Sequence, residues 1–482
     1  MSVRRAFLWS AIERFGQQAV QFGISIVLAR LLSPAEYGLM GMLAIFFALA
    51  NCFADAGLSS ALIQRKNISN DDETSVFFLN VAAGLVLTLI LCLMSPFVAA
   101  FYRQPALKLL LCVCSLQFFI SSLSMVQSAL LVREMDFRTL AIVSTVTTGL
   151  SGVIGIGMAW RGFGVWSLVG QGFMQACSNT LLIWRLRSWR PTGRFCWSSI
   201  RPLWPFSSRL LASGLLATVF EGMYSVVIGR LYKPAALGYF TRASGLANLP
   251  ALSITGIITR VTFPTFSKTQ DDKPHLKIIF RKTVRTLCGF HFPAMVGLAA
   301  VAGPLVKCLL TDKWTPCVPY LQLLAFCGLL YPLHALHLSI LTSQGRSDLF
   351  FRLEVIKRVL TAIIIVATFH FGILAMVWGM LLHSVLCYAL NAYYSRKIIA
   401  YTWTEQGKDI LPFLTFSMVV GAAIWSLKAL NFGSDWLLLL AQVFLGVMAF
   451  GLIAIAKRKS IYADAFTIGC DLCRGIGASL RT

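Results

Sequence analysis

Leu28-Ala-Arg-Leu-Leu-Ser-Pro-Ala-Glu-Tyr-Gly38 recurs 200 residues later as Ile228-Gly-Arg-Leu-Tyr-Lys-Pro-Ala-Ala-Leu-Gly238. The two copies share arginine, leucine, proline, alanine and glycine at five matching positions. Proline lacks an N–H group and begins or ends a helix, and the glycine that follows permits tight packing where the next helix starts. Each copy therefore predicts the turn of a helical hairpin.

Apolar stretches of membrane-spanning length surround both copies. Of the 482 residues, 57% are hydrophobic and 13% are charged, whereas soluble proteins carry a charged share of about a quarter. At about 20 residues per spanning helix, we predict about fourteen transmembrane helices and no sizeable soluble domain. The predicted spans are 7–28, 36–61, 75–96, 106–126, 139–160, 164–184, 203–229, 236–259, 283–308, 317–340, 353–371, 373–394, 410–428 and 436–456.

The repeated turn also predicts an internal duplication. Each copy lies between an odd and an even span, and six helices separate the copies. An even number preserves the orientation in the membrane, so the copies are related by an axis along the membrane normal. We expect an all-α membrane protein with two six-helix lobes in parallel repeat, 1–200 and 201–400, followed by two extra helices and a basic tail in 401–482.

The basic residues predict the orientation of the chain. The net charge is +23, from 42 Lys+Arg and 19 Asp+Glu. When the connections are numbered alternately and residues near helix ends are counted with the adjoining connection, as in 260–285 and 346–358, 31 basic residues fall in one set and nine in the other, and Arg14 and Arg242 are counted inside spans. Because cytoplasmic connections accumulate Lys and Arg, we expect both termini in the cytoplasm. The net charge then reflects orientation and does not indicate a nucleic-acid partner.

Long polar stripes run along four of the predicted spans. Polar and ionisable groups are costly in a membrane and usually face a partner or a hydrated cavity, and a spacing of three or four places each stripe on one helical face. We expect a central hydrated cavity, with hydrogen bonding between packed helices as the alternative. The stripes are Ser10, Glu13, Gln17, Gln21 and Ser25; Gln171, Gln175 and Asn179; Thr241, Ser244, Asn248, Thr255 and Thr259; and His383, Cys387 and Asn391.

Charged residues inside the spans suggest specific pairs. Folding the first hairpin about its turn brings Arg14 level with Asp55, so we expect an ion pair that is either structural or functional. In the second hairpin Glu221 lies level with Asn248, and Arg242 lies about five residues, or roughly 7.5 Å, closer to the outer face. An arginine side chain can cover part of that distance.

The sequence lacks motifs of catalysis. His334 and His337 lie three residues apart, but no acidic or cysteine partner joins them within their span at metal-ligand spacing. A glycine-rich phosphate loop, H-E-x-x-H and G-x-S-x-G are all missing. We therefore expect neither enzyme activity nor a cofactor nor a metal site, with an active site between helices as the alternative.

These features resemble a known superfamily of membrane exporters. Two six-helix lobes with two extra helices are similar to the multidrug/oligosaccharidyl-lipid/polysaccharide exporter superfamily. Over essentially the whole chain, individual strings resemble its Wzx-type lipid-linked oligosaccharide flippases, most of all the colanic acid exporters. The strings are Leu28–Gly38, Ile63-Gln-Arg-Lys-Asn-Ile68, Lys313-Trp314, Gln344-Gly-Arg-Ser-Asp348 and, most specific, Ile258-Thr-Arg-Val-Thr-Phe-Pro-Thr-Phe-Ser-Lys-Thr-Gln-Asp-Asp272.

The resemblance implies a transporter of the bacterial inner membrane. Its substrate would be a polyprenyl-diphosphate-linked oligosaccharide, the repeat unit of an exopolysaccharide or lipopolysaccharide, flipped to the outer leaflet by alternating access. Membrane lipid, a polysaccharide polymerase and a chain-length regulator would be its partners. A drug or small-cation antiporter of the same superfamily is the main alternative, followed by a membrane-embedded glycan polymerase or acyltransferase.

Position and chemistry select the candidate site residues, because the resemblance supplies no motif to carry over. Arginines suit a diphosphate and neutral amides suit sugar hydroxyls, and a carboxylate reachable by water within the membrane could couple transport to protons. Among the carboxylates we expect Glu221 to be the strongest candidate and Asp55 the weakest, because a pair with Arg14 would hold it ionised. The substrate-binding candidates are Arg14, Gln17, Gln21, Gln171, Gln175, Arg242 and Asn248, and the coupling candidates are Glu13, Asp55 and Glu221.

Overall fold

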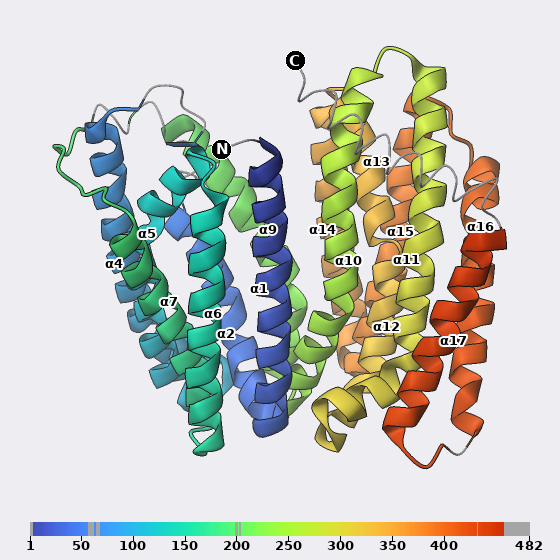
Figure 1. Ribbon diagram of the computed structural model, residues 1–482, viewed down its shortest axis with the longest axis horizontal. Helices are drawn as coiled ribbons and strands as arrows, with labels where there is room; N and C mark the ends of the chain where they lie inside the picture. Colours follow the sequence, from blue (N-terminus) through green and yellow to red (C-terminus); the bar gives the residue numbers. More distant parts are fainter. Residues whose placement is uncertain are drawn as a thin grey trace. The chain divides into compact units, whose positions relative to one another are not determined.

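The computed structural model describes residues 3–55, 62–63, 68–197, 201, 204–430 and 432–456. The description does not extend to the side chains of 3–15, 54–55, 204–207, 209–210, 257, 260–261, 347 and 452–456. The described residues are mostly α-helical and contain no strand (Figure 1). The all-α prediction is therefore confirmed.

The chain divides into two compact units, Met1–Gly238 and Tyr239–Thr482. The lobe boundaries at 200 and 400 stay a prediction. The first unit holds α1 (Val3–Leu31), α2 (Pro34–Asp55), α4 (Asn70–Tyr102), α5 (Ala106–Arg133), α6 (Phe137–Trp160), α7 (Trp166–Leu186), α9 (Trp204–Leu231) and the first turn of α10 (Pro234–Lys268). The second unit holds the rest of α10, then α11 (Lys273–Leu310), η1 (Asp312–Cys317), α12 (Val318–Leu329), α13 (Tyr331–Ser343), α14 (Ser347–Thr368), η2 (Phe369–Phe371), α15 (Ile373–Ile399), α16 (Trp403–Ser426), η3 (Leu427–Ala429) and α17 (Asp435–Ala456).

Helical hairpins build the first unit. α4 packs against α5, α1 against α6, α7 against both α5 and α6, and α2 against α9. α4 begins at a capping box, in which Ser69 and Asp72 each bond the other's backbone N–H, and it ends at Arg103 in the left-handed region. Local capping thus defines where this long helix starts and stops, and the apolar faces determine what it packs against.

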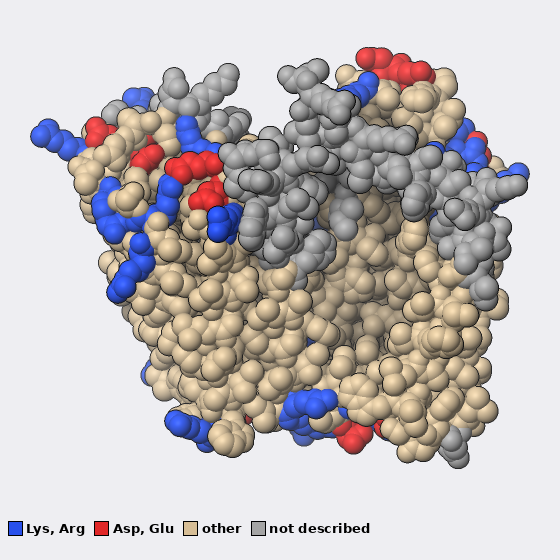
Figure 2. All heavy atoms as spheres, viewed as in Figure 1, with Lys and Arg blue, Asp and Glu red and all other residues tan. Residues whose placement is uncertain are grey.

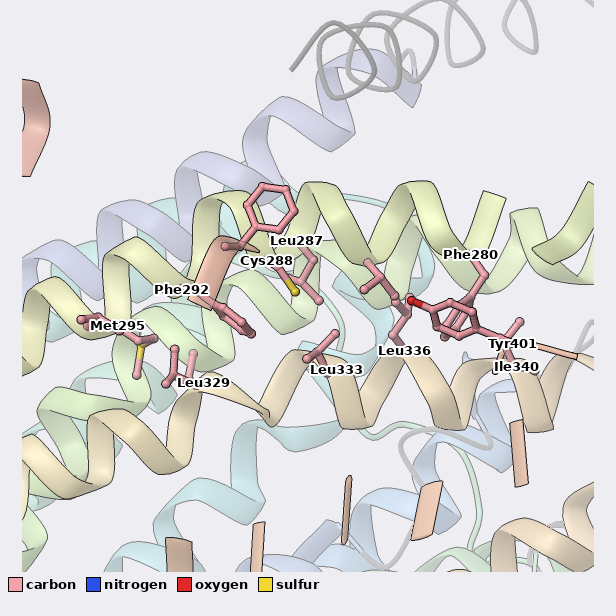
Figure 3. Packing of buried hydrophobic residues seen from close by; sticks show 14 of the residues in the cluster. Phe280, Leu287, Cys288, Phe292, Met295, Leu329, Leu333, Leu336, Ile340 and Tyr401 are labelled. Carbon is pink, nitrogen blue, oxygen red and sulfur yellow. The ribbon is translucent and has the colours of Figure 1, made fainter. Parts of the chain in front are cut away.

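α11 is the centre of the second unit, where it contacts α12, α16 and α17. Figure 3 shows its apolar face meeting α12 and α13. The predicted 317–340 span is broken into these two short helices, because Pro332 cannot donate the backbone N–H that would continue the helix. The core residues on this face are Phe280, Leu287, Cys288, Phe292 and Met295 of α11, with Leu329, Leu333, Leu336 and Ile340 opposite.

A membrane-embedded fold is supported by length and composition. Nine helical segments of the described residues are long and apolar enough to cross a membrane. In Figure 2 the charged residues gather near the helix ends and the walls between them are largely uncharged. Each of the fourteen predicted spans coincides at least in part with a helix or a helix pair. The count of fourteen crossings nevertheless stays a prediction.

Several helices begin before their predicted spans, by ten residues in α11, seven in α16, six in α14 and five in α4. α11 begins ten residues before the predicted 283, because Asp272 caps it by accepting the His275 backbone N–H at 3.0 Å. α14 begins at Ser347 and not at 353. Glu354, Lys357 and Arg358 therefore lie in the body of a helix, although the sequence analysis counted the basic pair with the connection before it.

Candidate functional site

The predicted site residues of α1 and α2 are partly described. The backbones of Glu13, Arg14 and Asp55 are helical, but their side chains lie outside the described residues. Further along α1, Gln17 is half-buried and Gln21 is exposed. The pair between Arg14 and Asp55 stays a prediction.

Gln175 of α7 joins its helix to α6. Its Oε1 accepts a hydrogen bond from Ser151 Oγ at 2.6 Å, and its Nε2 donates to Thr147 Oγ1 at 3.0 Å. Both ends of the amide are therefore engaged in bonds between packed helices. Gln171, one turn earlier, is half-buried and lies beside Gly155 of α6.

The same helix is bonded to α5 farther along. Thr180 Oγ1 donates to Ile120 O at 2.9 Å, and Trp184 Nε1 donates to Leu123 O at 2.8 Å. With Gln175 these contacts attach α7 to two neighbours through neutral groups. For the stripe of Gln171, Gln175 and Asn179, these bonds favour hydrogen bonding between packed helices, which was the alternative to a hydrated cavity.

Arg242 of α10 lies in the second unit against an aromatic side chain. Its guanidinium carbon is 5.8 Å from the ring centroid of Trp314, which is fully buried in η1 and also meets Tyr239 edge to face. A guanidinium at this distance over an aromatic ring makes a cation–π contact. Asn248, nearly two turns along, is exposed and donates to Ser244 Oγ at 3.3 Å.

Glu221 lies on α9 in the first unit and is exposed. Arg242 and Asn248, with which the sequence analysis aligned it, belong to the second unit. The predicted levels of these three side chains therefore stay a prediction.

A buried polar network joins α13, α14 and α15, and we call it the histidine network. His334 Nε2 lies 3.2 Å from Ser384 Oγ, which donates its own proton to Cys327 O. The serine therefore accepts from an Nε2–H group, while the Asn391 amide donates to Nδ1 at 3.3 Å. Both contacts are satisfied by a neutral imidazole. The histidine network consists of three hydrogen-bonded groups, which are His334 with Ser384 and Asn391, His337 with Ser395, and His383 with Thr361 and the carbonyl of Lys357.

His337 follows the same pattern at a fully buried position. Its Nδ1 lies 2.7 Å from Ser395 Oγ, and that hydroxyl donates to Ala392 O at 3.1 Å. The serine therefore accepts a proton from Nδ1–H, and Nε2 is left as an acceptor without a hydrogen-bond partner. The ring is held between Phe280 and Tyr388.

Charged groups of α14 border this network. His383 Nε2 lies 3.0 Å from Thr361 Oγ1, whose proton goes to Lys357 O. Glu354 pairs with Lys357 at 2.9 Å and with Arg358 at 3.1 Å, and Lys357 is only 9% exposed. The triad has one excess positive charge inside a helical unit. Lys357 and Arg358 lie about three turns into α14. Their position within a helix could have been noticed in the sequence, but the prediction counted both with the preceding connection.

A second charged cluster joins α11 to α16. Asp409, whose side chain is fully buried, accepts from Arg281 Nε at 2.7 Å, from Arg285 Nε at 2.7 Å and from Tyr401 Oη at 3.0 Å. Glu405, one turn earlier, pairs with Lys277 at 2.9 Å. These pairs attach the first extra helix to α11. The sequence analysis did not identify them, because the partners lie more than 120 residues apart.

The described part of the chain has no group of three or more His, Cys, Asp or Glu side chains that could hold a metal ion. What it offers instead are neutral amides and hydroxyls in the first unit, and histidines beside an excess of cations in the second. Such groups can hold sugar hydroxyls and anions.

Comparison with known proteins gives a consistent result. The chain is 29% identical to the lipopolysaccharide biosynthesis protein WzxC of Escherichia coli (strain K12) over 72% of this chain and 71% of that protein. It is 27% identical to the succinoglycan biosynthesis transport protein ExoT of Rhizobium meliloti (strain 1021) over 86% and 82%. The fold is similar to that of the lipid II flippase MurJ in an inward closed conformation, with a TM-score of 0.73 at 14% identity, over 94% and 99% of the two chains.

The family comparison covers the repeat turns and the string that carried the resemblance. Residues 27–319, more than half of the chain, match the family described as polysaccharide biosynthesis protein. This range contains both copies of the arginine-proline-glycine turn and the whole of 258–272. The resemblance to polysaccharide exporters is confirmed at the level of the family. The chain belongs to the polysaccharide biosynthesis protein family.

Proposed function

We propose that the protein flips a polyprenyl-diphosphate-linked oligosaccharide from the cytoplasmic to the outer leaflet of the bacterial inner membrane. The observation that carries the proposal is the fold, which is similar to that of a lipid II flippase over 94% of the chain. The family supplies the pathway, polysaccharide biosynthesis, and one relative is named a transport protein. A transporter explains this combination better than an enzyme does.

The chemistry of such a substrate requires a protein. A diphosphate and several sugars would have to cross about 30 Å of hydrocarbon, where a charge without a partner is very costly. A helical protein lowers that cost by presenting cations and amides within the membrane. The excess cation of the α14 triad suits an anionic head group.

Arg14 and Arg242 are the proposed ligands of the diphosphate, with Gln17, Gln21 and Asn248 near the sugars. Gln175 contributes less to this set than the sequence suggested, because Thr147 and Ser151 occupy its amide. Coupling of transport to protons through Glu13, Asp55 or Glu221 remains part of the proposal. Alternating access would expose these groups to one side of the membrane at a time.

The proposal includes orientation and partners. Both termini would face the cytoplasm, where the sugar lipid is assembled, and the flipped repeat unit would be consumed on the other side. A polymerase and a chain-length regulator are therefore the proposed partners on the outer face. Reporter fusions within 267–282 and 395–408 should give cytoplasmic signals.

Reconstituted vesicles test the function directly. A polyprenyl-diphosphate-linked oligosaccharide with a fluorescent sugar is placed in both leaflets, and an impermeant reductant quenches the outer one. Purified protein should make the inner half reducible. Arg242→Ala should slow this step about tenfold or more, because a charge-assisted bond is lost, whereas Arg161→Ala, at the exposed C-terminal end of α6, should leave the rate unchanged.

Two outcomes would contradict the proposal. If the rate equals that of protein-free vesicles while the protein is folded, the flippase assignment is wrong. If the protein instead moves a cationic dye in exchange for protons, the drug antiporter of the same superfamily is the better assignment.

A further inference from the structure

The two copies of the repeated turn touch each other within the first unit. A methyl group built on Gly38 of α2 would overlap the backbone carbonyl of Pro234 at the start of α10. A methyl group built on Gly238 would overlap the backbone carbonyl of Pro34. The contact is reciprocal, since the glycine of each copy meets the proline of the other. This is the signature of a two-fold relation at the point of contact.

Neither glycine is explained by its own backbone conformation. The glycines with positive φ are Gly162, Gly164, Gly345, Gly372 and Gly433, and the two repeat glycines are not among them. Glycine inside a helix costs about 1 kcal/mol relative to alanine. Both glycines lie near the start of a helix and have ordinary helical backbones. The feature that requires glycine there is therefore the close approach of the opposite backbone.

The contact continues between α2 and α9. A methyl group on Gly229 would come within 3.1 Å of Met42 Cγ, and one on Gly222 would overlap the side chain of Ile45. Farther along, Cys52 Sγ lies 3.2 Å from Thr218 Oγ1. In these contacts the residue numbers rise along α2 as they fall along α9. The two helices therefore run antiparallel, and the repeated turns meet at one end of the pair. The topology prediction assigns that end to the outer face.

The atoms at the crossing of the turns distinguish this end from the rest of the contact. The nearest neighbours of both added methyl groups are backbone atoms, which cannot rotate away, whereas those along α9 are mainly side-chain atoms. Side chains can adjust to small displacements of the helices. The contact between a backbone carbonyl and a glycine Cα, in contrast, exists only at one separation of the two turns. This end therefore has a defined closed position that small added volume would prevent.

We propose that Gly38 and Gly238 form the outer closing contact of the transport cycle, present in this structure and broken when the substrate leaves on the outer face. The inference rests on the proposed function. A methyl group at either position would force the turns apart and shift the population toward the state in which they are separated. Because one methyl group suffices, the effects of two should not add.

Distance measurements between the turns test the contact without any substrate. Spin labels carried by unnatural amino acids at the exposed positions Ala35 and Lys233 avoid the thirteen native cysteines. The wild-type protein in lipid nanodiscs should show a short-distance population. Gly38→Ala and Gly238→Ala should each reduce it about tenfold, and the double variant should not reduce it further.

The control is Gly245→Ala, in the same helix as Gly238. A methyl group there meets no atom within 4 Å, so the change alters helix propensity alone and the distance distribution should stay that of the wild type. If one repeat variant is not recovered folded, the other carries the test because the contact is reciprocal. An unchanged distribution in the repeat variants, or a multiplicative loss in the double variant, would overturn the proposal.

The outcomes also separate this inference from the proposed function. Separated turns with no flipping of the oligosaccharide lipid by the wild-type protein would support the contact and remove the substrate assignment. Normal flipping by both alanine variants with an unchanged distance distribution would do the opposite.

Discussion

The two compact units satisfy their buried polar groups with different chemistry. In the first unit α7 is attached to α5 and α6 along its length by neutral amide, hydroxyl and indole groups, as in the bonds of Gln175 and Thr180, and an ion pair between Arg187 and Glu134 lies just beyond the ends of α7 and α5, where Glu134 is exposed. In the second unit α16 is attached to α11 by Asp409 between two arginines, and α13–α15 enclose histidines beside Lys357.

The difference matters because neutral and charged bonds respond differently to loss of one partner. A neutral hydroxyl that loses its partner can bond a carbonyl of its own helix, as Thr147 already does with Ser144 O and as Ser151 can do with Thr148 O. A buried charge that loses its partner has no such substitute and leaves an uncompensated ion. The first unit should therefore tolerate polar substitutions that the second does not.

The largest effect is expected for Asp409→Asn. The change removes the carboxylate that Arg281 and Arg285 share. Breaking a buried pair costs about 3–5 kcal/mol, and the partial exposure of both arginines lowers our expectation to about 2 kcal/mol. The melting temperature of the purified protein in detergent should fall by several degrees.

Glu405→Gln is the matched control for that experiment. Glu405 lies one turn away on α16 and its side chain is 26% exposed, so water can replace the carboxylate as a partner of Lys277 and of Arg281, which is 3.4 Å away. Its effect should be within about 0.5 kcal/mol. Equal losses of stability for the two variants would show that Asp409 contributes no more than an exposed carboxylate does, and would contradict the prediction.

The sequence predicted much of the fold and little of the tertiary bonding. Hydrophobic stretches, the 200-residue repeat and the family strings were sufficient for an all-helical exporter-like fold, because they are properties of single helices and turns. Helical spacing placed Gln175 and Asn391 on polar faces, but it does not say which helix each face meets. Predicting the bonds to Thr147 and His334 would require knowing how helices that are tens of residues apart are rotated about their own axes.

The charged clusters were missed for a related reason. In the orientation prediction Arg281, Arg285 and Lys357 are counted with the connections at 260–285 and 346–358, because residues near helix ends are counted with the adjoining connection. The structure places them in α11 and α14, opposite carboxylates that the count ignored. The partner of Arg281 is 128 residues away, and no local pattern connects them.

The neutral bonds of the first unit are tested by Gln175→Met. The substitution keeps the length of the side chain and removes the bonds to Thr147 and Ser151. Hydrogen bonds between helices in membranes contribute about 0.6–1.7 kcal/mol, so the loss should be about 1 kcal/mol. Gln21→Met, at an exposed position, is the control for thermal stability. A loss as large as that of Asp409→Asn would contradict the contrast between the units.

Among the buried positions, the smallest effect is expected for His337→Leu, at a fully buried histidine. The change removes one hydrogen bond to Ser395, but it also removes the Nε2 atom that lacks a partner. Ser395 keeps its bond to Ala392 O, so no new polar group is left unsatisfied. Loss of the ring contacts with Phe280 and Tyr388 leaves a net effect of about 1 kcal/mol or less.

His334→Leu is the comparison, because it deprives both Ser384 and the Asn391 amide of a partner and should cost more. Thermal unfolding of the two variants, measured together, decides the point: if His337→Leu is the more destabilised, a neutral imidazole with an unused acceptor is the wrong description of this network, and the second unit depends on His337 as it does on Asp409.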